Sequence, residues 1–199
     1  MPRHRFVNTR ERIEEAATRL FVLKGIADTS VRDITREVGI SEGALYRHFE
    51  SKEDLVWQTF EQNYTAFASE LESLAAREST ARQKVGAMIR GFCRAHDDNP
   101  TVFNFLVFVQ HGQLAKLAED APTPVTVMRS VLVRAIENGE IPRQDPDLAT
   151  ALVLGAVLQP ATFAAYGRIA LKLEPVSDRL VAAAWAAVNS VPFKEGSKS

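Results

Sequence analysis

A short segment near the N-terminus concentrates side chains that can form hydrogen bonds with a nucleic acid. Between Ser41 and Lys52 the chain carries two serines, two glutamates, a tyrosine, an arginine, a histidine and a lysine. Gly43 and Ala44 lie among them and are small enough to let the backbone approach base edges closely. Basic and hydroxyl side chains are common donors to phosphate oxygens, whereas a carboxylate or a methyl group can distinguish bases. The segment therefore has the chemistry of a DNA contact surface.

Two predicted helices position these side chains. Ser30 and Asp33 have capping-box spacing at the start of a helix of about nine residues, and Gly39 ends it. Ser41 can cap a second helix of about eight residues. A glycine between two short helices lets them cross sharply, which is the layout of a helix-turn-helix whose second helix enters a major groove. The stretch from Ser30 to Phe49 therefore predicts a helix-turn-helix.

Neighbouring helices supply the scaffold for this motif. A helix over about 9–24 has an apolar stripe at spacing i, i+3, i+4, i+7, i+8, with Asn8 and Glu11 as a capping pair and Gly25 as the left-handed residue at its end. A longer helix begins after Ser51 and has a buried seam of about five turns. The seam consists of Val56, Phe60, Tyr64, Phe67, Leu71 and Leu74.

The remainder of the chain repeats the helical pattern. Further helices are predicted near 80–97, 100–117, 123–138, 146–166 and 175–190, separated by turn signals such as Asp97-Asp98-Asn99-Pro100 and Asn138-Gly139. No alternating strand pattern with hairpin turns accompanies them. We therefore expect an all-α protein of about nine helices, with a three-helix helix-turn-helix domain at 1–52 and a larger helical domain at 53–199.

Residues 9–55 resemble the N-terminal domain of the TetR family of regulators. The residues that carry the resemblance are Ile13-Glu14-Glu15-Ala16-Ala17, Leu20-Phe21, Gly25, Thr29-Ser30-Val31-Arg32-Asp33-Ile34, Val38-Gly39-Ile40-Ser41, Gly43-Ala44-Leu45-Tyr46-Arg47-His48-Phe49 and Ser51-Lys52-Glu53-Asp54-Leu55. Thr35 departs from the family, which usually has alanine there; its hydroxyl can bond back to its own helix. The resemblance implies a dimeric DNA-binding protein whose C-terminal domain dimerises and often holds an effector.

The same resemblance implies which residues meet DNA. Ser30, Arg32 and Ser41 lie at helix starts, where exposed N–H groups favour phosphate, and Arg32 can also reach a base. Glu42 is repulsive beside DNA unless it finds a donor such as cytosine N4. Gly43 can equally serve packing alone, as Leu45 and Phe49 do. The implied contact residues are Ser30, Arg32, Ser41, Glu42, Gly43, Ala44, Tyr46, Arg47, His48 and Lys52, and Arg3, Arg5 and Arg10 can add contacts from the N-terminal arm.

Two helices near the C-terminus have the composition of a dimer interface. The 146–166 segment places Leu148, Ala151, Leu152, Gly155, Leu158 and Thr162 at helical spacing. The 175–190 segment is rich in alanine, with Val176, Leu180, Ala183, Ala184, Ala187 and Val188 at similar spacing. Small residues let helices pack closely, and a two-fold dimer reads a palindrome. The alternative is that both are ordinary core helices of one subunit.

Aromatic and soft side chains gather on the middle helices and can line an effector cavity. An apolar cavity with few polar groups is the usual form of a small-molecule site, although helical spacing also explains most of these residues as core. Few charges fall in these stripes, so we expect a hydrophobic or aromatic effector rather than a phosphorylated one. The candidates are Phe60, Tyr64, Phe67, Phe92, Phe105, Phe108, His111, Met128, Gln159 and Phe163.

Composition and motifs narrow the remaining possibilities. The net charge is -1, but residues 1–52 carry ten Lys/Arg against eight Asp/Glu, a weakly basic balance. We expect Cys93 to be a buried small hydrophobe and His96 a surface residue, with no metal or cofactor, and no catalytic motif is present. A single cysteine, no apolar signal region and no apolar run of about 18 residues fit a cytoplasmic protein. We expect a repressor that a small effector releases from a palindromic operator; the alternatives are a regulator controlled by a protein partner and a helical enzyme.

Overall fold

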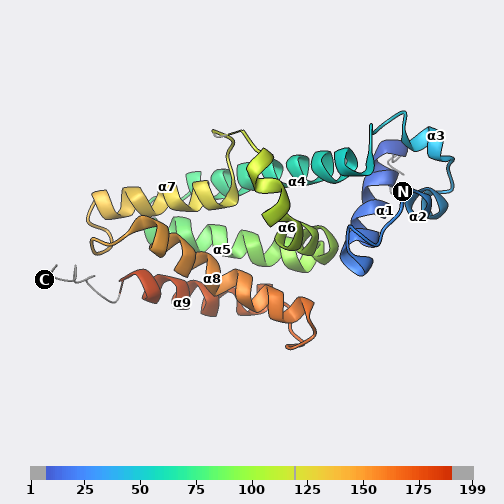
Figure 1. Ribbon diagram of the computed structural model, residues 1–199. Coiled ribbons are helices and arrows are strands. Elements are labelled where there is room, and N and C mark those ends of the chain that lie inside the picture. Colours follow the sequence, from blue (N-terminus) through green and yellow to red (C-terminus); the bar gives the residue numbers. More distant parts are fainter. Residues whose placement is uncertain (1–7, 119, 190–199) are drawn as a thin grey trace, which may run out of the picture. The chain divides into compact units, whose positions relative to one another are not determined.

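The computed structural model describes residues 8–118 and 120–189 and is all-α over that part of the chain (Figure 1). Nine α-helices occur there, joined by turns and two short 3-10 helices, and no strand is present in the same residues. The α-helices are α1 (Thr9–Lys24), α2 (Val31–Val38), α3 (Glu42–Leu45), α4 (Lys52–Ala76), α5 (Ala81–Asp98), α6 (Pro100–Gln113), α7 (Pro124–Glu137), α8 (Pro146–Ala165) and α9 (Ser177–Asn189). The 3-10 helices are Leu114–Lys116 and Glu174–Val176. The predicted fold class is confirmed.

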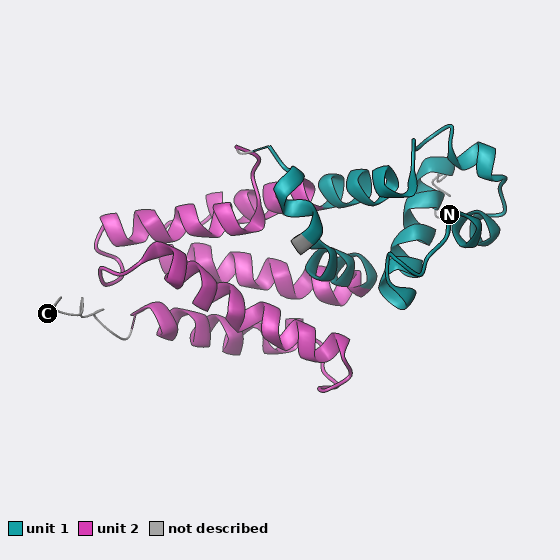
Figure 2. Ribbon diagram, in the orientation of Figure 1, with its two compact units in different colours: residues 1–63, 101–119 teal, residues 64–100, 120–199 magenta. Residues whose placement is uncertain are grey.

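The chain forms two compact units (Figure 2). Unit 1 comprises residues 1–63 and 101–119, and unit 2 comprises residues 64–100 and 120–199. Helix α4 therefore begins in unit 1 and ends in unit 2, and α6 belongs with the N-terminal helices although the sequence places it between α5 and α7. The expected functional boundary at residue 52 stays a prediction, because compactness does not show which part folds by itself.

Local capping explains where the helices of unit 1 begin and end. Asn8 and Glu11 form the predicted capping box of α1, and Gly25 ends that helix at φ 88°, which favours glycine. Helix α6 packs on this scaffold, because Phe105 stacks on Phe21 with ring centroids 6.1 Å apart. The buried apolar side chains include Ile13, Ala16, Ala17, Leu20, Phe21, Ile34, Val38, Leu45, Phe49, Leu55, Val56, Phe60, Phe103, Phe105 and Leu106.

Unit 2 is a helical bundle in which α5 contacts α7, α8 and α9. Gly91 lets α5 approach α4 closely, since a Cβ at this position would lie 2.8 Å from Leu74 Cδ1 and 3.0 Å from Leu71 Cδ2. The buried side chains are mostly aliphatic, and Cys93 is fully buried among them as expected. They include Leu71, Val85, Met88, Ile89, Phe92, Met128, Leu132, Val153, Val157, Leu173, Val181, Ala184 and Val188.

A buried polar cluster joins the end of α5 to the loop before α9, and it corrects the expectation for His96. This residue is only 8% exposed, so its assignment to the surface was wrong. Its Nδ1 lies 2.8 Å from Asp97 Oδ1. The Asp97 carboxylate also accepts hydrogen bonds from the backbone N–H of Leu173, at 2.9 Å, and of Glu174, at 2.8 Å. His96 is therefore a buried partner of the carboxylate that holds this loop.

Helix α8 is more apolar than the sequence pattern suggested. It is long enough and apolar enough to cross a membrane by length and composition alone, with a mean hydropathy of 1.7, so the expectation that no run of this length exists was too strict. Core helices of soluble proteins pass the same test. Only 33% of this apolar window is buried within the chain, so α8 presents apolar surface that the rest of unit 2 does not cover.

Candidate DNA-binding surface and effector-binding region

The turn between α2 and α3 is held where α2 ends. Gly39 adopts a left-handed conformation, with φ 76° and ψ 40°, and its N–H donates to the carbonyl of Thr35 at 2.9 Å. Arg12 reaches across from α1, and its Nη2 donates to the carbonyl of Val38 at 2.6 Å. These contacts satisfy carbonyl groups that the helix end would otherwise leave without partners. Hydrogen bonds to backbone carbonyl groups, and not only apolar packing, therefore set the position of α3 relative to α2.

Helix α3 is shorter than predicted. The sequence favoured about eight residues, but the α-helix spans only Glu42–Leu45 and is followed by a turn through His48. The N–H of Phe49 still donates to the carbonyl of Leu45 at 3.1 Å, so the chain remains coiled. Leu45 and Phe49 are 0% and 1% exposed. These two inward anchors hold the short segment on its scaffold, as the sequence predicted.

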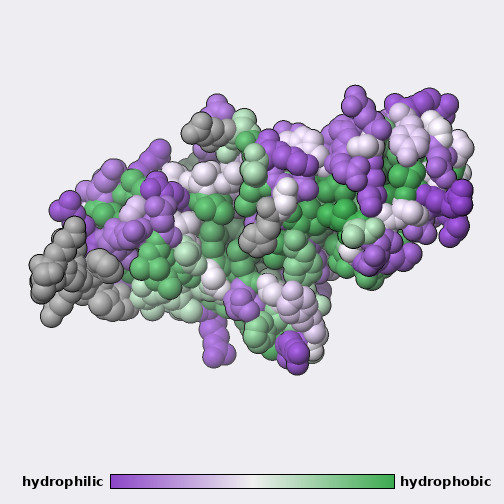
Figure 3. Space-filling model, in the orientation of Figure 1, coloured by the Kyte–Doolittle hydropathy of each residue, from purple (hydrophilic) through white to green (hydrophobic). Residues whose placement is uncertain are grey.

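The predicted DNA-contact residues of this segment lie on its outer side. Ser41, Glu42, Gly43 and Arg47 are exposed, and Tyr46 is 49% exposed although it is aromatic. Two further candidates, Ala44 and His48, are half-buried. A Cβ at Gly43 would meet nothing within 4 Å, so this position is open. The face is polar and accessible, as a surface that contacts DNA requires (Figure 3 shows largely hydrophilic residues around α1–α3).

The two predicted serine contacts already serve as helix caps. Ser30 Oγ donates to Asp33 Oδ2 at 2.7 Å and accepts from the N–H of Asp33. The hydroxyl and the backbone N–H of Ser30 hold the pKa of Asp33 below its usual value. Ser41 Oγ accepts from the N–H of Ala44 at 3.2 Å. Both hydroxyls therefore fix the starts of α2 and α3, a role that capping spacing had indicated for each.

Lys52 has a structural role that sequence reasoning missed. Its Nζ donates to the carbonyl of Ile26 at 2.9 Å and to that of Thr29 at 3.0 Å. An ammonium group has three donors, so these bonds leave one for a phosphate. Lys52 thus ties the start of α4 to the loop between α1 and α2. The contacts are more than twenty residues apart in sequence, and no spacing rule would have revealed them.

Arg10 is occupied within unit 1. Its guanidinium donates to Gln58, forms an ion pair with Glu14 at 2.9 Å and lies 4.6 Å from the centre of the Phe49 ring. Burial raises the pKa of Glu14 despite the opposing effect of Arg10. Arg10 therefore braces α1 against the segment after α3, and its contact with DNA stays a prediction. Arg3 and Arg5 lie outside the described residues.

The candidate effector residues of unit 1 differ in environment. Phe60 and Phe105 are fully buried, and Phe105 is stacked on Phe21 of α1. Phe108 is 40% exposed. His111 belongs to α6, and its side chain is outside the described part of the molecule. Phe105 is thus a packing contact between α6 and the helix-turn-helix scaffold.

The candidate effector residues of unit 2 fall into two groups. Tyr64, Phe92 and Met128 are buried, and burial raises the pKa of Tyr64 to about 12. Half-buried Phe67 contacts Phe92 edge to face, with ring centroids 4.9 Å apart. Gln159 and Phe163 are instead exposed on α8. The structure therefore brings Phe67 and Phe92 together and separates Gln159 and Phe163 from the interior.

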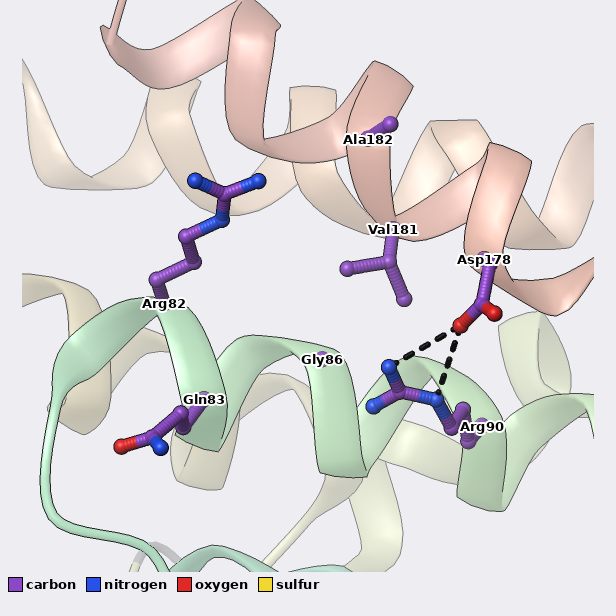
Figure 4. Close-up of a pocket in the computed structure, with 7 residues that line it drawn as sticks. All are labelled: Arg82, Gln83, Gly86, Arg90, Asp178, Val181 and Ala182. Atoms are coloured by element: carbon purple, nitrogen blue, oxygen red, sulfur yellow. Dashed lines mark hydrogen bonds and ion pairs between the residues drawn. The ribbon is translucent and has the colours of Figure 1, made fainter.

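Two grooves in unit 2 lie away from these candidates. The larger, of about 310 Å³, runs between α5 and α9 and is closed at one end by an ion pair from Arg90 to Asp178 at 3.0 Å (Figure 4). Gly86 forms part of its lining, and the Arg82 side chain extends from α5 toward α9. The smaller groove, of about 150 Å³, lies between residues of α4, α5 and α7. Both are open and partly polar, and neither is lined by a predicted effector residue.

Helices α8 and α9 expose small and apolar side chains on their outer faces. On α8 the exposed stripe follows helical spacing through Leu148, Leu152, Gly155, Gln159 and Phe163, and exposed Tyr166 directly follows the helix. The predicted stripe differs at its C-terminal end. Leu158 and Thr162 are half-buried, and the residues that follow them, Gln159 and Phe163, are exposed instead. The exposed face of α9 carries Ala182, Ala183, Ala186 and Ala187, while Ala184 and Val188 belong to the core.

The N-terminal helices are similar to those of a known family. Residues 13–58 match the model of the family described as bacterial regulatory proteins, tetR family. The uncharacterised HTH-type transcriptional regulator YerO of Bacillus subtilis is 36% identical over 95 residues, which are 45% of this chain and 32% of YerO. The matched segments span about a third of the length of the first curated relatives. The fatty acid metabolism regulator protein of Bacillus subtilis is 24% identical over 155 residues, 75% of this chain and 80% of that protein.

Solved structures share the whole fold. The transcriptional regulator FadR from Bacillus subtilis, in complex with stearoyl-CoA, matches with a TM-score of 0.71 and 19% identity, over 90% of this chain and 98% of that chain. A putative fatty acid metabolism regulator of Clostridium perfringens matches with a TM-score of 0.75 and 17% identity, over 92% and 100%. At these identities the similarity establishes the fold.

Proposed function

Because the chain belongs to the tetR family of bacterial regulatory proteins, we propose that it is a cytoplasmic, homodimeric, DNA-binding transcriptional regulator that represses genes from a palindromic operator. One observation carries the proposal: α3 and the turn after it present an accessible polar face, held from behind by buried Leu45 and Phe49. Such a segment fits a major groove, where side chains contact base edges and phosphates. We expect no catalytic activity.

The dimer is proposed to form through the outer faces of α8 and α9. The exposed stripe of α8 is apolar apart from Gln159, and beyond its first turn the exposed face of α9 carries alanines up to the terminal Asn189. Contiguous apolar surface of this kind is costly to leave in water and marks an interaction site. A two-fold dimer places two copies of α3 on half-sites about one helical turn apart, ~34–36 Å. Gln159 and Phe163 fit this interface better than an effector cavity, because both are exposed.

The effector is proposed to be hydrophobic, with a long-chain acyl-CoA as the first candidate. FadR from Bacillus subtilis, a structural neighbour, binds stearoyl-CoA, and the acyl chain would suit the apolar side chains Tyr64, Phe67, Phe92 and Met128. A CoA group is phosphorylated, so this candidate revises the expectation of an unphosphorylated effector. We propose that binding of the effector releases the protein from DNA. By linkage, DNA must weaken effector binding by the same factor.

Control by a protein partner remains the second candidate. Phe60, Phe92, Phe105 and Met128 are each no more than 3% exposed, as they would be in a filled core. In that case no small molecule would enter among them, and a partner would regulate the protein. Titration with stearoyl-CoA separates the two candidates, with CoA alone and a fatty acid as comparisons. Release of DNA by stearoyl-CoA supports the effector, and no binding of any of the three supports the partner.

The DNA-binding proposal is tested by selection from a random pool of duplexes with the full-length protein. We expect a single enriched palindrome, bound by a dimer and weakened by rising salt, because phosphate contacts release counterions. Fluorescence anisotropy of the enriched duplex against a scrambled one measures the specificity ratio. A pool without an enriched palindrome would contradict the proposal.

A further inference from the structure

The second residue of α2 and the first residue of α3 form an ion pair on the exposed side of the helix-turn-helix. Arg32 Nε donates to Glu42 Oε1 at 3.4 Å, and the two side chains are 76% and 47% exposed. They are ten residues apart in sequence and meet because the chain reverses at Gly39. The pair lies on the face where the proposed function places DNA, and the inference below rests on that function.

Pairing changes what Glu42 can do beside DNA. A lone carboxylate would be repelled by the phosphates, whereas a carboxylate paired with arginine presents little net charge. The two acidic residues of the neighbouring helix α2 also have donors: Glu37 accepts from Arg19 at 2.7 Å, and Asp33 accepts from Ser30. Glu42 differs from both because its partner is a cation that is itself a predicted DNA contact. Its carboxylate can therefore remain on this face without opposing binding.

The pair leaves a donor and an acceptor side by side. Only Nε of Arg32 and Oε1 of Glu42 are joined, so the two terminal guanidinium nitrogens and Oε2 are available on that exposed surface. In the major groove a C·G base pair presents the acceptors O6 and N7 of guanine beside the N4 donor of cytosine. An arginine fork suits the guanine edge, and a carboxylate suits cytosine N4. The two arrangements are complementary.

We propose that Arg32 and Glu42 act as one unit that selects a single C·G base pair in each half-site. Arg32 donates to guanine, and Glu42 accepts from the cytosine paired with it while also holding the arginine in place. Removing either side chain should therefore abolish the preference at the same base pair. Removing both should cost little more than removing one, because the residues do not act independently.

The test is a base-preference profile of the full-length protein on every single substitution of its selected operator. We expect the wild type to favour C·G at one position of each half-site by roughly 5- to 150-fold over the other pairs, the range for a good bidentate contact. Arg32→Ala, Glu42→Gln and the double variant should each lose that preference and keep the others. Arg32→Lys retains the charge but not the fork, so it should lose most of the preference while overall affinity is kept.

The pair Arg19–Glu37 supplies the matched control, because it is also an exposed arginine–glutamate contact, between α1 and α2. Arg19→Ala and Glu37→Gln should leave the profile unchanged. The proposed joint action of Arg32 and Glu42 is wrong if the single variants alter different base pairs. It is also wrong if Glu42→Gln raises the affinity equally for all sequences. Either result would leave the proposed DNA binding intact. A wild-type protein that selects no operator would overturn both this inference and the proposed function.

Discussion

The outer face of α3 and the outer faces of α8 and α9 are both accessible, but they are built for different partners. Around α3 the exposed groups are hydroxyls, charges and one tyrosine, and each carboxylate of α2 is held by a nearby donor. On α8 and α9 the exposed groups are mostly leucines, alanines and a phenylalanine, with Gln159 on α8 and charged residues only near the helix starts. The first surface suits a hydrated, charged polymer, and the second suits an apolar surface such as a second copy of the chain.

The two regions also differ in how they are held in place. The helix-turn-helix depends on long side chains that reach backbone carbonyls, with Arg12 bound to Val38 and Lys52 bound to Ile26 and Thr29. The bundle of unit 2 depends mainly on aliphatic packing and on a close approach at Gly91. A surface that must match DNA spacing needs a fixed backbone, which these hydrogen bonds to carbonyl groups help to supply.

The largest effect is expected from removing the anchor behind α3. Phe49→Ala should lower the free energy of unfolding by about 3–5 kcal/mol, because it empties a buried aromatic site. It also removes the ring beside the Arg10 guanidinium. Urea denaturation followed by circular dichroism measures the loss, and the neighbouring half-buried His48→Ala should change stability far less. Equal stability of the two variants would show that apolar anchoring does not hold this segment.

The next effect concerns the apolar face of unit 2. Leu152→Glu should shift the protein from dimer to monomer, because two-fold symmetry would bury a carboxylate from each subunit, at a cost of several kcal/mol in all. Sedimentation velocity measures the change, and Val125→Glu on α7 is the matched control, since the two residues are 42% and 41% exposed. The proposed interface is wrong if Leu152→Glu remains dimeric or if Val125→Glu dissociates equally.

A smaller effect is expected from the polar cluster at the end of α5. Asp97 is buried, which raises its pKa, but the backbone N–H groups of Glu174 and Leu173 and the His96 ring outweigh this, so the pKa is lowered overall. The charged carboxylate therefore stabilises the fold above its unfolded-state pKa, and this contribution is lost as the pH falls through the lower folded-state value.

Asp97→Asn should accordingly lower the free energy of unfolding by about 1–3 kcal/mol at pH 7, since amide oxygens accept more weakly than a carboxylate. The difference from the wild type should narrow as the pH falls below about 4. Denaturation at several pH values measures it, and exposed Asp98→Asn is the control. A difference that persists unchanged at low pH would indicate a role other than the charge of the carboxylate.

The smallest effect is expected from one exposed cation after α3. Arg47→Ala should weaken binding to all DNA sequences by a similar factor and reduce the salt slope by about 1, because one phosphate contact is lost. Substitution of the exposed Arg77 by alanine, directly after the end of α4, should change neither the affinity nor the salt slope. Arg47 is a cleaner probe than Lys52, whose substitution would also release the loop between α1 and α2. An unchanged slope would place Arg47 away from the phosphates.

Local signals made most of the fold predictable. The capping pairs at Asn8, Ser30 and Ser41 and the glycines at 25 and 39 mark helix ends through contacts within a few residues, and the structure has each of them. The length of α3 was overestimated, because helical spacing continues through His48 while the hydrogen bonds tighten into a turn. Sequence periodicity indicates which side chains face inward, but it does not show to which carbonyl each backbone N–H donates.

The sequence by itself determined the order of the helices, the caps that delimit them and the segment whose residues we expect to contact DNA, because these depend on neighbours along the chain. Tertiary structure alone decided that Lys52 and Arg10 serve as internal ties, that His96 is buried, and that Gln159 and Phe163 face outward on α8. It also brought Arg32 to Glu42. Each of these outcomes depends on how one helix is rotated and placed against another, which a pattern of residue types leaves open.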